Sequence, residues 1–195
     1  VLAQANVDGA QNGTALVAEL QDGEGNTAVF KVNGANVARI DHTGKGYFNG
    51  GTVAGGADVA EYFEVNGSKS EYEPGDVLII DQSADRKVTK SSEPYSSLVA
   101  GVYATKPGLY LTEENAVEYQ LERMVPMGVI GVIPTKVCGE GGPIRRGDML
   151  VTSSVPGVAM KADPDKVRVG QVIGKALQDF DGQGTGKINV LVSIK

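Results

Sequence analysis

Short apolar runs bounded by glycine or proline follow one another along the second half of the chain. They are rich in valine and isoleucine, which is typical of β-strands. The runs lie at residues 76–80, 98–102, 128–133, 149–151 and 188–192. Asn66-Gly67, between residues 63–65 and the region of Tyr72, predicts a hairpin turn. Only residues 112–123 have a helical pattern, with Thr112 as N-cap, acidic residues in the first turn and Arg123 at the end. The sequence predicts a mainly β fold with at most one short helix.

The front of the chain, residues 1–55, shows a sparser pattern. Segments 28–32 and 37–40 flank Asn33-Gly34, a dipeptide that tolerates the positive φ angles of a tight hairpin turn. This stretch holds only fourteen Val, Leu, Ile, Phe or Tyr residues, while ordering each residue costs about 1–2 kcal/mol. We therefore expect the stretch to share an apolar seam with other copies of itself. The candidate seam residues are Val29, Val32, Val37, Ile40, Tyr47 and Phe48.

A change in composition divides the chain. All eight prolines lie at or beyond Pro74, and glycine and asparagine dominate the front. We predict two regions: residues 1–55 form a thin intertwined β stalk segment, and residues 56–195 form a compact C-terminal β tip domain.

A weak repeat runs through the second region. The motif at positions 75–79 (Gly-Asp-Val-Leu-Ile) recurs at positions 147–151 (Gly-Asp-Met-Leu-Val). Each copy would hold a Gly-Asp turn, a buried strand, a return strand ending near Lys90 or Lys161, and a further strand carrying a glycine. This predicts a pseudo-duplicated, β-clip-like domain; the alternative is that so short a match arises by chance.

Charge and composition exclude several classes of function. The 18 Lys and Arg against 24 Asp and Glu give a net charge of −6, which disfavours nucleic acid as a partner. One Cys and one His exclude a disulfide framework and a His/Cys zinc site. The longest apolar stretch, 124–134, is interrupted by Pro126 and Gly128 and is shorter than the roughly 20 residues of a membrane span. We expect no cofactor, no metal and no membrane insertion.

Two carboxylates three residues apart stand at the boundary between the regions. A turn or helical start would bring Asp58 and Glu61 to one side, where their repulsion would raise one pKa and suit acid–base chemistry. The alternative is that Asp58 caps a turn and Glu61 completes a capping box. No other carboxylate pair suggests a hydrolase acting on an external polymer.

Several segments resemble the end of bacterial and phage fibre proteins. Residues 36–52 resemble the stalk end, and residues 56–61, 74–78, 142–153 and 156–161 resemble the C-terminal domain that closes such fibres. The resemblance implies a homotrimer with an elongated β stalk and a compact cap. It also implies an extracellular location, on a cell surface or on a phage or tail-like particle, and a structural or adhesive protein that is not an enzyme.

The stretch Ala57-Asp58-Val59-Ala60-Glu61 is also similar to the opening of G2 peptidase domains, the self-cleaving intramolecular chaperones of phage appendages. The resemblance would place Asp58 at the cleavage point, with Glu61 as its acid–base partner. Self-cleavage is therefore the alternative function.

A fibre tip suggests a receptor-binding surface. A cell-surface glycan or protein is the expected partner besides the chain itself, and Tyr103, Tyr110 and Tyr119 are the candidate contact residues because tyrosine combines an apolar ring with a polar hydroxyl. The first residues, Val1 to Ala5, fit either the tail of a signal peptide or an ordinary stalk segment.

Overall fold

The computed structural model describes residues 18–21, 23–52, 55–111 and 123–194. The chain divides into two compact units, Val1–Val53 and Ala54–Lys195. Strands dominate both, and the helical element of the described residues is one 3-10 turn, η1 (Lys69–Glu71). The predicted β class is confirmed. The helix predicted over residues 112–123 falls, apart from Arg123, outside the described residues.

The small unit contains one antiparallel sheet in the order β1 (Asn26–Val32), β2 (Ala35–Asp41), β3 (Gly46–Phe48). The predicted hairpin is confirmed, since Asn33 and Gly34 have φ angles of 49° and 82° between β1 and β2. Asn tolerates this left-handed conformation and Gly adopts it freely, which explains the dipeptide.

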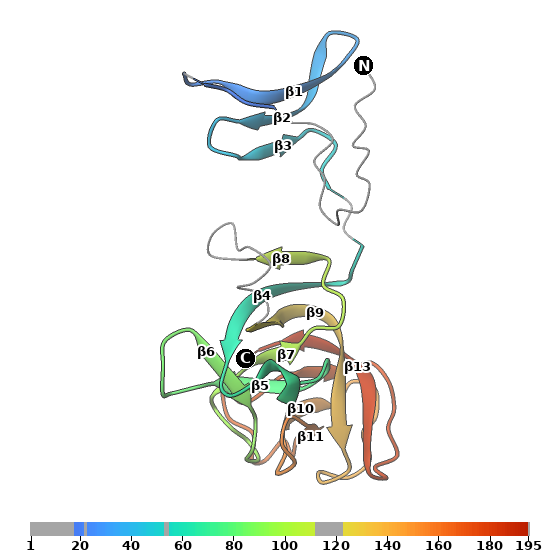
Figure 1. Cartoon of the computed structure of the whole chain (residues 1–195). Coiled ribbons are helices and arrows are strands. Elements are labelled where there is room, and N and C mark those ends of the chain that lie inside the picture. The colour runs from blue at the N-terminus through green and yellow to red at the C-terminus, as the bar shows by residue number, and fades with distance from the viewer. Residues whose placement is uncertain (1–17, 22, 53–54, 112–122, 195) are drawn as a thin grey trace, which may run out of the picture. The chain divides into compact units, whose positions relative to one another are not determined.

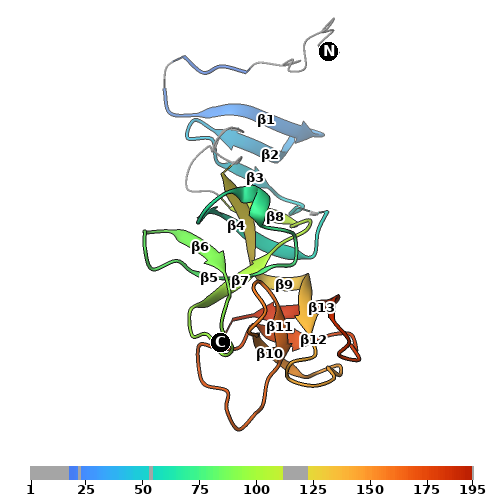
Figure 2. The same ribbon diagram turned by 60° about the horizontal axis from the view of Figure 1, so that its bottom comes forward.

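The described residues of the large unit form ten strands in one hydrogen-bonded sheet. They are β4 (Asp58–Val65), β5 (Val77–Ile80), β6 (Lys87–Lys90), β7 (Val99–Tyr103), β8 (Leu109–Leu111), β9 (Met124–Cys138), β10 (Met149–Thr152), β11 (Ala159–Lys161), β12 (Gly174–Ala176) and β13 (Thr185–Ser193). In Figures 1 and 2, the green strands β5–β7 and the orange to red strands β10–β13 form separate groups, and β9 connects them.

The strand pairings close two rings that share β9. In the first ring, β9 pairs with β7, β7 with β5, β5 with β6, β6 with β4, and β4 again with β9. In the second, β9 pairs with β13, then β12, β10 and β11, and β11 returns to β9. Closure leaves neither ring with an unpaired strand edge.

The pairing registers show that the second ring duplicates the first. Leu78 lies opposite Lys90 on one side and Gly101 on the other, and Leu150 lies opposite Lys161 and Gly174. The parallel contacts correspond as well: Val65 pairs with Val88 and Val137 with Ala159. The predicted repeat is therefore present as two rings with matching registers, and chance similarity is excluded.

An aspartate holds each repeat together at its Gly-Asp turn. Asp76 accepts hydrogen bonds from the Glu73 N–H at 2.8 Å and from Lys136 Nζ at 2.6 Å, and it pairs with Lys90 at 3.2 Å. Asp148 accepts from the Arg145 N–H at 2.8 Å and pairs with Lys161 at 2.9 Å. Each return strand thus ends in a lysine because that lysine binds the aspartate that opens the repeat.

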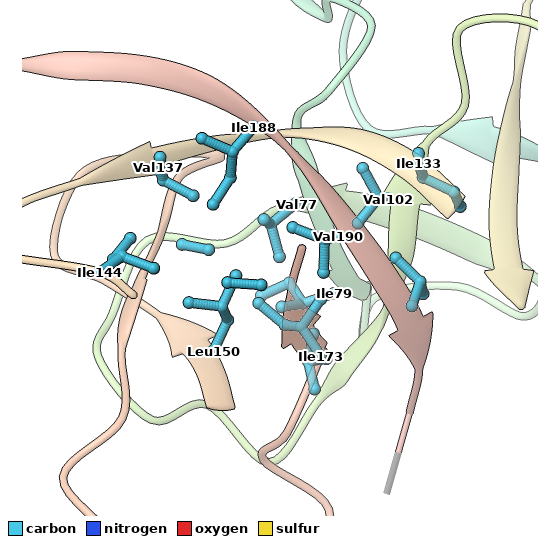
Figure 3. Packing of buried hydrophobic residues seen from close by; sticks show 14 residues of the cluster. Val77, Ile79, Val102, Ile133, Val137, Ile144, Leu150, Ile173, Ile188 and Val190 are labelled. Carbon is cyan, nitrogen blue, oxygen red and sulfur yellow. The ribbon is translucent and has the colours of Figure 1, made fainter. Parts of the chain in front are cut away.

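The core of the large unit draws on both rings. Figure 3 shows side chains from both converging, among them Val77 and Ile79 of β5, Leu150 of β10 and Val190 of β13. A second cluster, around Leu78 and Val88, belongs to the first ring, and a third, around Val151 and Met160, belongs to the second. The shared cluster makes the two rings one folding unit, since burial in it requires both.

Asn66-Gly67, which also predicts a hairpin, starts a different turn. Gly67 has a φ of 79°, but the chain then enters η1. Ser68 caps η1 and Glu71 bonds back to the Ser68 N–H at 3.1 Å, which completes a capping box. The chain forms the capping box rather than a hairpin because the capping box satisfies backbone donors that a turn leaves free. Strand β4 consequently pairs with distant strands rather than with a neighbour in sequence.

Candidate functional site

The predicted site residues Asp58 and Glu61 both lie on strand β4. Residues three apart on a strand point to opposite faces, so the two carboxylates of one chain do not converge as a turn or helical start would require. The capping-box interpretation of the pair is also wrong, because Asp58 is the first residue of a strand. The strand forms here because β9 and β8 pair with this segment on its two sides.

Asp58 is a buried carboxylate without a complete set of partners. Only 8% of the residue is exposed, and no described residue hydrogen-bonds to its Oδ2 atom. It lies opposite Gly131 of β9, where a side chain on the glycine would collide with the Asp58 backbone. Burial raises the pKa of Asp58 above its usual value. Asp58 therefore has the character of a proton-holding group.

Glu61 has a different environment. Its Oε1 atom accepts a hydrogen bond from Arg86 at 2.7 Å, and both side chains are partly exposed. An exposed ion pair of this kind stabilises a fold only slightly. Within one chain, Glu61 is thus a partly exposed side chain, paired with Arg86, on the opposite face of β4 from Asp58.

Two of the three candidate tyrosines lie in the same part of the sheet as β4: Tyr110 is opposite Ala60, and Tyr103 and Glu61 are both opposite Met127 of β9. Tyr110 of β8 stacks on Tyr62 of β4 with ring centroids 5.3 Å apart and an interplanar angle of 19°. Burial, and then the proximity of other ionisable groups, raises the pKa of Tyr62 and of Tyr103. Tyr119 lies outside the described residues. Tyr62 was not predicted as a site residue, and the stacking shows only in the pairing of β4 with β8.

An apolar row crosses three strands on one face of this region. Val59 of β4 lies opposite Leu109 of β8 on one side and opposite Ile130 of β9 on the other. Leu109 is 52% exposed and Ile130 56% exposed, and the three residues line an open hollow with Gly56 and Gly108. Sequence analysis missed this row, because strand pairing alone brings the residues together.

The candidate seam residues of the small unit are divided between its two faces. The register aligns Phe30, Ala38 and Phe48 in one row, with Ile40 on the same face. The next row aligns Val29, Arg39 and Tyr47 on the opposite face. Phe30 and Phe48 are each about half exposed. Val32 and Val37 lie at or beyond a register shift and are also exposed.

The opposite face carries a polar cluster. The Arg39 guanidinium lies 3.5 Å from the centre of the Tyr47 ring, and the Tyr47 hydroxyl donates to Asp41 at 3.1 Å. The Thr43 hydroxyl donates to Asp41 at 2.7 Å and is the main cause that lowers the pKa of Asp41 to about 2. The face of Phe30, Ile40 and Phe48 is accordingly the apolar one, and Phe30 is the member that sequence analysis missed.

The side chains of the described residues meet the requirements of neither a metal site nor a membrane-spanning helix. Among the described residues, no three His, Cys, Asp or Glu side chains are grouped so as to hold a metal ion. No helix among them is long and apolar enough to cross a membrane.

Comparison with known proteins identifies the fold. No protein-family model matches the chain, and no curated protein matches it in sequence. The structure is similar to pre-mature gene product 12 of bacteriophage phi29, with a TM-score of 0.55 and 16% identity. The match covers 82% of this chain and 24% of that one, so this chain spans about a quarter of the protein it resembles.

Two further phi29 structures match less well. A C-terminal fragment of gene product 12 has a TM-score of 0.48 and 17% identity, covering 70% of this chain and all of the fragment. The N base of head fibre gp8.5 has a TM-score of 0.32 and 14% identity, covering 70% of this chain and 90% of that one. These identities are low, and the likeness to pre-mature gene product 12 concerns the fold alone. The similarity of residues 57–61 to G2 peptidase domains stays a prediction.

Proposed function

We propose that this protein is a structural component of a phage or surface fibre, in which three copies join through the small unit and the large unit drives trimerisation and caps the end. The observation that carries the proposal is the apolar face of Phe30, Ile40 and Phe48, with two half-exposed phenylalanines, on a sheet for which the described residues supply three strands. Phe30 and Phe48 are about half exposed, so burial of the remaining surface would gain about half of the roughly 1.5–3 kcal/mol of full burial for each. Assembly of copies supplies that burial without an open strand edge.

The mass of the 195-residue chain in solution tests this proposal. Light scattering at micromolar concentration should give three times the chain mass. Phe48→Asp should lower the mass, because it places a charge on the apolar face. Val29→Asp, on the opposite face, is the matched control and should leave the mass unchanged. A monomeric wild-type chain would contradict the proposal.

A surface receptor is part of the proposed function, and the stacked pair Tyr62 and Tyr110 is the surface that suits it. Tyr110 is about half exposed, and a flat aromatic face of this kind stacks on the apolar side of a sugar ring. Tyr110→Ala should abolish retention of the protein on a glycan array, while Tyr72→Phe, a buried tyrosine, should not.

A specific observation favours self-cleavage as a second candidate. Asp58 is a buried carboxylate with one unpartnered oxygen, and it begins the first strand of the large unit. The matching gene product 12 structure is described as pre-mature. Hydrolysis of the Ala57–Asp58 bond would release the large unit after assembly. Because Glu61 faces away from Asp58 within one chain, the acid–base partner would be Glu61 of a neighbouring copy.

Intact mass spectrometry of the purified chain tests self-cleavage. Fragments ending at Ala57 and beginning at Asp58 are expected, and Glu61→Ala should leave one uncut species. Glu64→Ala, three residues along the same strand, is the control and should still be cut. Uncut wild-type protein under all assembly conditions would contradict self-cleavage and leave the fibre proposal standing.

A further inference from the structure

Strand β8 is the strand of the large unit that stands outside both closed rings. It pairs with β4 through Val59–Leu109, Ala60–Tyr110 and Glu61–Leu111. It is the end of the strand order, and no described strand pairs with its other side. An uncovered strand edge is a template for pairing with another chain.

The backbone of β8 directs its donors to this open side. The Gly108 N–H donates to the Asp58 carbonyl at 2.8 Å, toward β4. Successive residues of a strand point their N–H groups to alternate sides, so the N–H groups of Leu109 and Leu111 point away from β4. Both residues are exposed. The edge thus combines apolar side chains with backbone donors that pair with no strand of the described residues.

Comparison of the two repeats shows that β8 is an addition. In the second repeat, residues 177–184 connect β12 to β13, whereas in the first, residues 104–123 connect β7 to β9. The second ring closes without any strand equivalent to β8, so ring closure does not require β8. Its three residues, Leu-Tyr-Leu, are all exposed, which is unfavourable for an isolated chain.

We infer that β8 docks on a second copy of this chain, through the open edge of Leu109 and Leu111 and the apolar row of Leu109, Val59 and Ile130. The inference rests on the proposed fibre assembly and names its contact in the large unit. A second copy is the occupant because β4 begins at Asp58, shortly after the small unit ends at Val53. Copies joined through their small units therefore carry their β4–β8 edges into the same assembly.

Charge supports this occupant. The chain has a net charge of −6, so association of identical copies requires contact surfaces without acidic groups. Leu109, Val59 and Ile130 carry no charge, and Asp58, the acidic residue lining the same hollow, is buried. Glu61, opposite Leu111 on the same face, is partly exposed but is paired with Arg86 at 2.7 Å. The apolar row itself therefore brings no unpaired carboxylate of the described residues to the contact.

Mass measurements on the 195-residue chain test the inference. Leu109→Asp should raise the concentration needed for half-assembly by about tenfold or more, which corresponds to about 1.4 kcal/mol. Ile80→Asp is the matched control: Ile80 is also 52% exposed but lies on β5, away from the row. A shift for Leu109→Asp and none for Ile80→Asp supports the inference. Equal shifts, or none for Leu109→Asp in a trimeric wild type, overturn it.

Hydrogen exchange provides a readout that needs no variant. The amides of Leu109 and Leu111 should be protected at least tenfold more in the assembled wild-type chain than after dilution to monomers. Fast exchange in the assembled chain overturns the inference. Protection that persists in the monomer also overturns it, because the chain itself would then cover the edge. A wild-type chain that is monomeric at every concentration removes the fibre proposal, whereas a trimer with unprotected β8 amides removes only this contact.

Discussion

The two rings of the large unit share their pairing registers but differ in how deeply the key aspartate is buried. Asp76 is fully buried and bonds two lysines, one of them Lys136 from the shared strand β9. Asp148 bonds a single lysine, and its side chain is 23% exposed. Asp76 is the deeper because the second ring also packs on it, through Gly157, whose carbonyl accepts from the Val77 N–H at 2.8 Å.

The comparison shows that duplication preserves backbone geometry while each copy adapts to its surroundings. Both copies need the Gly-Asp turn and the glycine at the third strand, because these set the hydrogen-bond register. The first ring contacts the second ring at Asp76 and carries the additional strand β8.

The largest expected difference between the rings concerns these aspartates. Asp76→Ala should lower the free energy of unfolding by about 3–5 kcal/mol, because it removes the buried carboxylate that pairs with Lys90 and Lys136 and leaves Lys136 with only the exposed Glu73. Asp148→Ala should cost about 1 kcal/mol, since its ion pair is partly exposed. Urea unfolding at fixed protein concentration measures both. Equal losses in the free energy of unfolding would show that the deeper burial of Asp76 does not make it contribute more than Asp148.

Equivalent glycines test whether the rings are alike in backbone packing. A side chain at Gly174 would collide with the carbonyl oxygen of Leu191, and one at Gly101 would lie 2.6 Å from the carbonyl oxygen of Gly128. Gly174→Ala and Gly101→Ala should each lower the free energy of unfolding by about 2–3 kcal/mol. Gly55→Ala, where nothing lies within 4 Å, is the control and should change the stability by less than about 0.5 kcal/mol. If Gly101→Ala leaves the free energy of unfolding unchanged while Gly174→Ala lowers it, the two glycines are not equivalent in backbone packing.

Asp58 is a carboxylate of the first ring. The sequence separation between Leu78 and Leu150 also separates Asp58 from Ile130, so the second ring has an isoleucine at the equivalent position. Asp58→Asn should raise the free energy of unfolding at pH 7 by about 1 kcal/mol, since a buried oxygen without a partner carries a desolvation cost. The pKa of Asp58 is raised on folding, so its ionisation opposes folding above that pKa. The penalty disappears as the pH falls to the unfolded value near 3.8.

Thermal unfolding of wild type and Asp58→Asn between pH 3 and pH 7 measures this effect. The two stabilities should converge toward the acidic end. A constant difference across this range would indicate that hydrogen bonding, rather than ionisation, distinguishes Asp58 from asparagine.

The smallest effect is expected at the surface pair of Glu61 and Arg86. Glu61→Gln should lower the free energy of unfolding by less than about 1 kcal/mol, and added salt should reduce the loss. Asp179→Asn, which removes the comparable exposed pair with Arg146 in the second ring, should behave alike. A loss of several kcal/mol for Glu61 alone would indicate that it has a buried role in the assembly.

Local patterns sufficed to predict most strands and the repeat. Valine- and isoleucine-rich runs such as 77–80 form strands, and the two Gly-Asp turns align the repeats. The same patterns did not predict that Asp58 and Glu61 lie on a strand, because Ala57 to Glu61 has no strong β pattern and only pairing with β8 and β9 makes it extended. The hairpin predicted at Asn66-Gly67 is wrong, because the capping box that follows decides that turn.

The amino-acid sequence by itself determined the β class, the Asn33-Gly34 hairpin and the presence of two related halves, since these depend on side-chain shape and turn chemistry over a few residues. Tertiary structure alone decided that β9 is shared by two closed rings, that Asp76 is deeply buried while Asp148 is not, and that Leu109, Val59 and Ile130 form one row. These features depend on pairing between residues far apart in the chain, and the register of such pairing is fixed only when the whole core packs.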